Sequence, residues 1–524
     1  MLKRLNKIEP FVFLLVLIVN VAPVFGVKYF VTLDGGSHNN NVAIISSLLT
    51  DPSSIFSSVY SINSELVPNW SGHFLLLILS YFFKYSIAEK ILISIILILM
   101  PIFFRKIIGQ IAPQNILFSY FFFPFTHYGL LYLGFYNFTI GVLFLTILIS
   151  FWLKNNEKRS VYFYVILWFL FFAIYFSHLF IFIVSVLFIA VHILATSNYK
   201  EEGSFKKILK RGLPILICAL PFLYLTATYF LNRPAKQLAD IQYLGANNVI
   251  QMIINGDAFS LDVYKEKAYS ALFVLLLTFL FLLTAIQNSI SVNHQINRKQ
   301  KVLALLKSPG HLFLLMCLLM FILAFVMPND DGYGGYITIR FVYLGFFFLL
   351  LFASFQKQPD IKTRLLLFSV LIFSYTNLMD IKKEGLSERN IERKKLEPAF
   401  DKISPNSVVL HFNLTGRTKW DTGHLVENIG AEKQTLVLSN YEATKGYFPV
   451  VWNCSKNIHF IAGGYTIAPG NCQKQNIKET KDIDFVLVYG DKTGCIEYDE
   501  IVNRISDGYH VVYQSSSVSL FKKE

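Results

Sequence analysis

The chain has 524 residues, of which 54% are hydrophobic and only 15% are charged, and its formal net charge at pH 7 is +13. Soluble domains carry about 25% charged residues, so this composition excludes an ordinary soluble protein and predicts a polytopic protein of the lipid bilayer. Lysine and arginine stand in short runs between apolar segments, where they set topology, so the positive charge does not predict a nucleic-acid partner.

The first apolar segment covers about residues 11–31 and follows a basic start that contains Lys3, Arg4 and Lys7. The positive-inside rule then predicts a cytoplasmic N-terminus and an extracytoplasmic loop over residues 34–72. Apolar residues recur at helical spacing over residues 42–49, which predicts a short helix on the outer surface of the membrane. Residues 73–83 are too few to span and are predicted to form a second interfacial or re-entrant helix.

Further apolar runs of spanning length follow along the chain. They cover about residues 87–104, 115–133, a return segment that ends at Lys154, and then 213–231, 269–290, 311–327, 337–355 and 365–378. The run over residues 161–194 differs, because about 34 residues form a helix of roughly 50 Å, which exceeds the ~30 Å hydrocarbon core. Basic clusters flank both of its ends, so we predict two spans that turn near Ser177 and His178. The total is about eleven transmembrane helices.

The composition changes after the last predicted span, and residues 381–524 are predicted to form a separate domain behind a membrane domain of residues 1–380. A charged helix is expected over residues 387–403 and another over residues 498–505. Strand-like runs lie at residues 407–412, 435–438, 485–489, 510–513 and 518–521. This pattern predicts a small extracytoplasmic α/β domain. Cys454 and Cys472 both lie in it, so a disulfide between them is compatible with the compartment, although spacing alone does not establish the pairing.

Asp34 and His38 are the residues that most clearly point to chemistry. They follow the first span directly, and at i and i+4 on a helix their side chains share a face. A partly desolvated Asp34 could act as a general base or bind a divalent metal, with His38 as its orienting partner or a second ligand. The alternative is that Asp34 caps the helix that starts near Ser37. Whether a metal binds is left open. If one does, Asp34 is the expected ligand and Mg²⁺ or Mn²⁺ the expected ion.

Several other polar residues map to the same predicted side of the membrane. Arg340 lies at the start of a span, where it either binds an anion such as a lipid phosphate or extends to the interface. His178 is either a substrate ligand or structural, and Asn137 either binds a sugar hydroxyl or caps the helix that follows it. Further predicted pocket residues are Glu65 and His73 in the first loop and Asp331 before Arg340.

Polar residues of the C-terminal domain are predicted to form a solvated face, some of which could bind an acceptor. They are Arg417, Asp421, His424, Asn440 and Glu442. The sequence contains no Walker loop, no dinucleotide fingerprint and no cysteine-rich zinc pattern, which argues against cytoplasmic nucleotide chemistry. An energy source on the outer face would have to arrive as an activated lipid.

The first span, the stretch Asp34-Gly35-Gly36-Ser37-His38 and the helix after it resemble the GT-C superfamily of membrane glycosyltransferases. Two further stretches are similar to poorly characterised bacterial members: Pro124 with Gly134-Phe135-Tyr136-Asn137-Phe138 and Gly141, and Asn440-Tyr441-Glu442-Ala443 with Phe448-Pro449-Val450. Unlike the best-known members, this chain has a glycine rather than a second acidic residue after Asp34.

The resemblance implies transfer of a sugar from a polyprenyl-(di)phosphate carrier to a glycan, lipid or protein acceptor. The reaction would take place on the outer face of a bacterial inner membrane, with Asp34 as base or metal ligand and Arg340 at the carrier phosphate. Three alternatives remain: a polysaccharide polymerase or ligase, a transport protein such as a flippase, and a non-catalytic protein of the same fold.

Overall fold

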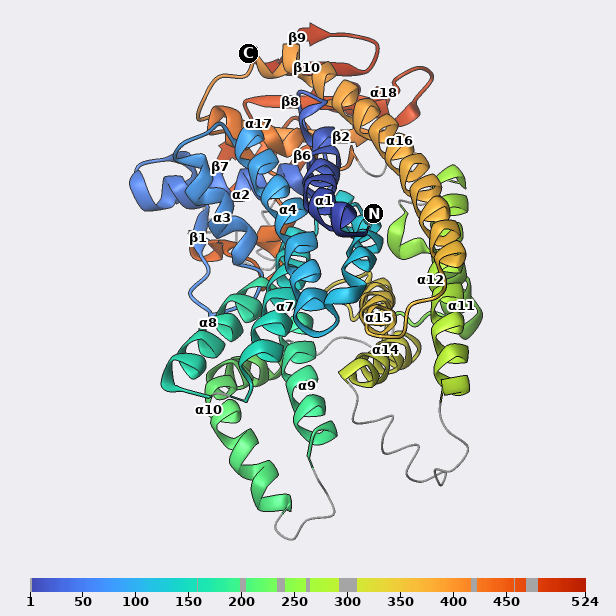
Figure 1. Ribbon diagram of the computed structural model, residues 1–524. Helices are drawn as coiled ribbons and strands as arrows, with labels where there is room; N and C mark the ends of the chain where they lie inside the picture. Colours follow the sequence, from blue (N-terminus) through green and yellow to red (C-terminus); the bar gives the residue numbers. More distant parts are fainter. Residues whose placement is uncertain are drawn as a thin grey trace. The chain divides into compact units, whose positions relative to one another are not determined.

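In the computed structural model (Figure 1), the described residues are 2–157, 159–197, 204–232, 241–260, 264–291, 309–415, 422–456, 458–467 and 479–524. They divide into two units, each assembled from segments far apart in the chain. The helical unit contains Met1–Ala22, Ile96–Leu131 and Phe138–Lys383. The sheet unit contains Pro23–Ile95, Tyr132–Asn137 and Glu384–Glu524, so most of the loop after the first helix belongs with the C-terminal residues.

The apolar helices account for most of the predicted spans. Seven described helices are long and apolar enough to cross a membrane, which is compatible with a membrane protein and is fewer than the predicted eleven. They are α1 (Leu2–Phe25), α4 (Tyr85–Ile111), α7 (Tyr136–Asn155), α10 (Ser204–Leu231), α12 (Tyr264–Ser291), α15 (Ile337–Ser354) and α16 (Ile361–Phe400). Three more predicted spans are shorter apolar helices, α8 (Val161–Ser177), α9 (Leu179–Ala195) and α14 (Pro309–Val326). A further short helix, α11, covers Ala246–Ile254.

The predicted hairpin over residues 161–194 is confirmed as two helices. Helix α8 ends and α9 begins at His178, whose extended backbone (φ −161°) interrupts the helical hydrogen bonds between them. The last predicted span and the charged helix after it, by contrast, form one continuous helix of 40 residues, α16. The stretch between them contains no proline to remove a backbone donor, so the helix continues through the change from apolar to charged residues.

The prediction of a span over residues 115–133 is wrong. This stretch consists of a 3₁₀ helix, η2 (Pro113–Phe122), and two single-turn helices, α5 (Phe123–Thr126) and α6 (Gly129–Tyr132). Its apolar side chains are buried against protein, as fully enclosed Phe121, Phe122 and Leu130 illustrate. An apolar run can serve a protein core as well as a bilayer, and composition does not distinguish the two.

The five predicted strands of the sheet unit are all present and form one sheet with the order β3-β2-β8-β10-β9. Their bounds are β2 (Val408–Leu414), β3 (Leu436–Val437), β8 (Phe485–Gly490), β9 (Tyr509–Gln514) and β10 (Val518–Lys523). Strand β2 runs parallel to both β3 and β8, whereas β10 runs antiparallel to β8 and β9. The predicted helix before β9 is α18 (Ile496–Ile505).

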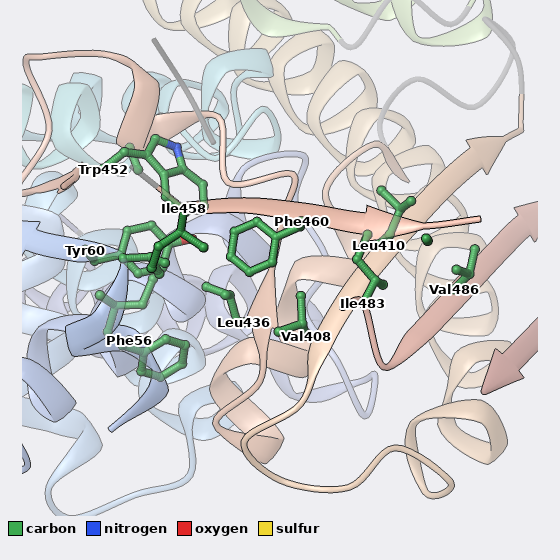
Figure 2. Close-up of a cluster of buried hydrophobic side chains, with 14 of the residues drawn as sticks. Phe56, Tyr60, Val408, Leu410, Leu436, Trp452, Ile458, Phe460, Ile483 and Val486 are labelled. Carbon is green, nitrogen blue, oxygen red and sulfur yellow. The ribbon is translucent and has the colours of Figure 1, made fainter. Parts of the chain in front are cut away.

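Both faces of strands β2, β3, β8 and β10 contribute residues to buried core clusters, which explains why these strands are rich in apolar residues, whereas β9 is largely exposed. Successive side chains of a strand point to opposite faces, so Val408 and Leu410 join one core cluster while Val409 joins the other. Figure 2 shows the first cluster, which includes Leu410 of β2 and Phe460. A second, three-stranded sheet of β5 (Ile458–Ala462), β6 (Tyr465–Ile467) and β7 (Glu479–Asp482) supplies Phe460.

The first loop is built into this unit. Its strand β1 (Tyr60–Ile62) pairs antiparallel with β4 (Val450–Trp452), and the Tyr60 ring stacks on Trp452 with centroids 4.2 Å apart. Helix α2 (Gly35–Thr50), the predicted surface helix, packs on α17 (Asn428–Lys433). Its residues are buried from Gly35 through Ile45, so the prediction that it lies in the membrane interface is wrong. The short helix predicted after it is α3 (Ser71–Ser80).

Cys454 forms a disulfide bond, in agreement with the prediction of a disulfide in this region. Its predicted partner, Cys472, lies outside the described residues, so the pairing itself stays a prediction.

Replacing Phe460 by alanine is expected to lower the free energy of unfolding by about 3–5 kcal/mol, because it leaves a cavity where a ring is fully enclosed. Val511→Ala is the matched control, since that side chain is 49% exposed on β9. Denaturant unfolding of the purified chain in detergent, followed by near-ultraviolet circular dichroism, measures both. Equal losses for the two variants would contradict the assigned core.

Candidate functional site

Five ionisable side chains from four separate segments meet in the sheet unit, and we call them the acid–histidine cluster. Asp34 and His38 come from the start of α2, and His73 comes from α3. His424 precedes the 3₁₀ turn η6 (Leu425–Glu427), and Glu442 opens the 3₁₀ turn η7 (Glu442–Thr444). Ionisable groups are rarely buried unless they are paired or functional, so this convergence identifies the candidate site.

The backbone around Gly134 positions Asp34. The Asp34 N–H donates to the carbonyl of Leu133, and Gly134 follows in the left-handed conformation (φ 83°). A Cβ atom on Gly134 would lie 2.9 Å from the Cβ of Asp34, so the close approach requires glycine. Asp34 occupies the N-cap position of α2, but its side chain makes no capping hydrogen bond. The capping alternative therefore does not account for this carboxylate.

Asp34 is 8% exposed, and its Oδ1 lies 3.8 Å from Nε2 of His424. Burial disfavours the charged form and raises the pKa of Asp34 to about 6, against the opposing effect of His424 and His38. A hydrogen bond with Tyr441 also acts on the carboxylate. A carboxyl group with a pKa near the working pH is suited to accept a proton from a substrate.

His424 joins Asp34 to a second buried carboxylate. Its Nδ1 lies 2.8 Å from Oε1 of Glu427, and its ring stacks on Tyr441 with centroids 4.5 Å apart. Burial lowers the pKa of His424, but the charges of Glu427 and Asp34 outweigh it and bring the pKa to about 9. Glu427 also accepts a hydrogen bond from Oγ of Ser37 at 2.6 Å. At neutral pH His424 is therefore a cation held between two carboxylates.

His38, Glu442 and His73 form the other half of the cluster. Nδ1 of His38 lies 2.9 Å from Oε1 of Glu442, and Nε2 of His73 lies 3.1 Å from Oε2. Burial raises the pKa of Glu442, but the two histidines outweigh it and hold the pKa below its usual range. These three residues each offer a ligand atom, all within 4.8 Å of one another, so they could hold a metal ion. Asp34, the metal ligand considered from the sequence, is not in this group.

The structure thus brings together three of the predicted site residues, Asp34, His38 and His73. Asn137 instead accepts the backbone N–H of Gly72 at 2.7 Å, which connects the start of α3 to the start of α7. Its predicted contact with a sugar hydroxyl stays a prediction. Glu65 is exposed and lies outside the cluster.

The remaining predicted site residues, Arg340, His178 and Asp331, belong to the helical unit. Arg340 and His178 both contact Phe138, with the guanidinium carbon 5.7 Å and the imidazole centroid 5.2 Å from the centre of its ring. Oδ1 of Asp331 accepts the N–H groups of Tyr333 and Gly334 and closes the turn before α15. The predicted contact of Arg340 with a carrier phosphate stays a prediction.

The prediction of a solvated face for the polar residues of the C-terminal region is wrong for three of them. Glu442 and Asn440 are buried, and His424 lies in the cluster. Glu427 was not predicted at all. Arg417 and Asp421 lie outside the described residues.

One local signal could have revealed these partners. The α2 sequence Ser37-His38-Asn39-Asn40-Asn41 is polar on every face of the helix, yet all five residues are buried. Buried polar groups require hydrogen-bond partners, so such a run predicts polar residues from elsewhere in the chain. Asn41 indeed donates to Oε2 of Glu442 at 2.5 Å.

A scan against protein-family models finds no family that matches this chain, and a search of curated proteins finds none that is similar to it. The resemblance to the GT-C superfamily therefore depends on the motifs alone.

Proposed function

We propose that this protein is a membrane glycosyltransferase that moves a sugar from a polyprenyl-(di)phosphate carrier to an acceptor hydroxyl on the outer face of a bacterial inner membrane. The observation that carries the proposal is the buried carboxylate of Asp34, which makes no capping hydrogen bond to α2 and lies beside the cationic His424. The apolar helices support a lipid-soluble donor, because an activated lipid reaches its enzyme within the bilayer.

In the proposed reaction Asp34 accepts the proton of the acceptor hydroxyl. The acceptor oxygen forms a bond to the anomeric carbon of the sugar while the bond from that carbon to the carrier phosphate breaks. The carrier leaves as polyprenyl phosphate or diphosphate with the electron pair of that bond. His424 stabilises the ionised form of Asp34 before the reaction, and Glu427 in turn holds the imidazolium. The buried cluster is thus suited to one step, the transfer of a proton from the acceptor hydroxyl to Asp34.

The experiment compares lipid-linked sugars and envelope glycans in a deletion strain with those in strains that carry the wild-type chain or Asp34→Asn. We expect the deletion to remove one sugar from the envelope product and to accumulate the sugar-loaded carrier. The wild-type chain restores the product and Asp34→Asn does not. Shortened chains with no lost sugar would instead indicate a polymerase, and a carrier retained on the cytoplasmic leaflet would indicate a flippase.

The rate of transfer is expected to depend on pH in a defined direction. Asp34 must be ionised to accept a proton, and its pKa is about 6. The value of kcat/KM should therefore fall about tenfold per pH unit below that value and level off above it. Loss of the His424 charge near pH 9 should lower the rate again. Initial rates in isolated membranes across this range measure the profile, and a rate that does not change through pH 6 would contradict Asp34 as the base.

A further inference from the structure

In the part of the acid–histidine cluster formed by His38, His73 and Glu442, hydrogen-bond acceptors face one another. His38, His73 and Glu442 are almost completely buried. Nδ1 of His38 and Oε1 of Glu442 lie 2.9 Å apart, which is the distance of an ion pair when the imidazole is protonated. Within the described part of the chain, neither atom has a hydrogen-bond partner besides the other. Buried polar atoms are costly when they are not satisfied, so two such atoms face to face call for a positive charge between them, either a proton or a metal ion.

In each imidazole ring, the nitrogen that points away from Glu442 shows where the proton lies. Nε2 of His38 lies 2.8 Å from the carbonyl oxygen of Gly134, and Nδ1 of His73 lies 3.3 Å from that of Asn69. A carbonyl can only accept, so each of these nitrogens carries the proton. In a neutral ring, the nitrogen that faces Glu442 then presents a lone pair. Two lone pairs and a carboxylate that point at one another require a positive charge between them.

We infer that Nδ1 of His38, Nε2 of His73 and Oε1 of Glu442 bind one Zn²⁺ ion. Two imidazoles and one carboxylate are a donor set that zinc accepts, whereas Mg²⁺ prefers oxygen ligands throughout. Tetrahedral zinc with bonds of about 2.0–2.1 Å separates its ligand atoms by about 3.3 Å. The cluster atoms, 2.9 Å apart at the closest and all within 4.8 Å, lie around that separation.

The neighbours of the three ligands match the second shell of a metal site. The hydrogen bonds to Gly134 and Asn69 fix each imidazole in the tautomer that binds a metal. On the carboxylate, Asn41 donates to Oε2 of Glu442, and Asn440 donates to Oδ1 of Asn41 at 2.7 Å. This chain of amides orients Glu442 and leaves Oε1 available. Three protein ligands leave a fourth position of the ion open.

The competing explanation is that protons on the two inner nitrogens supply the positive charge. The two explanations differ in metal content, which is independent of whether the protein transfers sugars. The full-length protein is purified in detergent without chelator, incubated with a small excess of Zn²⁺, desalted and analysed by mass spectrometry of its metals. We expect about one zinc per chain.

The variants test the ligands one by one. His73→Asn and Glu442→Gln are expected to lose the bound zinc, whereas the control His510→Asn, an exposed histidine on β9, retains it. Asn41→Ala removes only an orienting residue and should weaken zinc binding by about 10–100-fold. A wild-type chain with no more zinc than His73→Asn would overturn the inference, as would one equivalent of Mg²⁺ or Mn²⁺ in place of zinc.

Because some of these variants could fail to fold, a second measurement tests the metal site in the wild-type chain itself. Addition of Co²⁺ to the metal-free protein should produce the intense visible absorption of a tetrahedral cobalt site, and Zn²⁺ should abolish it. Only the weak spectrum of hydrated Co²⁺, unchanged by Zn²⁺, would show that the three residues do not form the site.

Discussion

Asp34→Asn is expected to lower sugar transfer by about 100- to 10,000-fold, the usual contribution of a general base. Asparagine keeps the shape of the side chain but cannot accept the proton of the acceptor hydroxyl. Burial raises the pKa of Asp34 to about 6 despite the opposing charge of His424, so the fold disfavours the ionised carboxylate and a neutral asparagine should not destabilise it. The thermal midpoint of the variant should therefore stay at or above that of the wild type.

Asp51→Asn is the matched control for this experiment. Asp51 lies at the other end of the same helix α2 and is exposed. Its Oδ1 accepts hydrogen bonds from the N–H and the hydroxyl of Ser53. Transfer measured in isolated membranes should be unchanged by Asp51→Asn. If Asp34→Asn retained the wild-type rate at equal expression, Asp34 would have no role as a base and the proposed function would lose its central residue.

Gly36→Ala is expected to disrupt the Asp34–His424 pair through a steric clash. A Cβ atom at Gly36 would overlap the carbonyl oxygen of His424 and lie 2.9 Å from Nδ2 of Asn428. The carbonyl is backbone and cannot rotate away, so the turn that carries His424 must move from α2. Overpacking of this kind costs about 1–3 kcal/mol. Displacement of His424 should lower transfer at least tenfold, because a misplacement of about 1 Å can cost about 100-fold.

The control for this variant is Gly446→Ala, in the same unit, where an added Cβ atom meets no other atom within 4 Å. Thermal unfolding in detergent and the transfer rate are measured for both variants. Gly446→Ala should change stability by less than about 0.5 kcal/mol. If Gly36→Ala behaved in the same way, the close packing of α2 against the His424 turn would be contradicted.

Local patterns in the sequence were sufficient to predict those helices and strands that follow from segment length and residue type. The hairpin of α8 and α9 follows from the length of its apolar run, because one helix of that length does not fit the bilayer. The five strands of the main sheet were recognisable from short β-branched and aromatic runs. In the site, Asp34 and His38 were identifiable because both follow the first apolar segment closely and because they lie one helical turn apart.

Failures arose where burial depended on distant partners. Residues 115–133 and α2 were assigned to bilayer and interface from composition, but the helical unit encloses the first and the sheet unit encloses the second. A one-dimensional pattern reports how apolar a segment is, and it does not report whether lipid or protein covers it.

The amino-acid sequence alone was enough to establish a chain of apolar helices with a strand-containing C-terminal region and to single out the carboxylate after the first helix. The chemistry available to that carboxylate came from folding, since Glu442 lies 401 residues from Asn41 and still accepts its hydrogen bond. His424 reaches Asp34 in the same way. These contacts form when α2 packs on α17 and the C-terminal residues around it. They join residues about 400 positions apart, so no local sequence pattern can predict them.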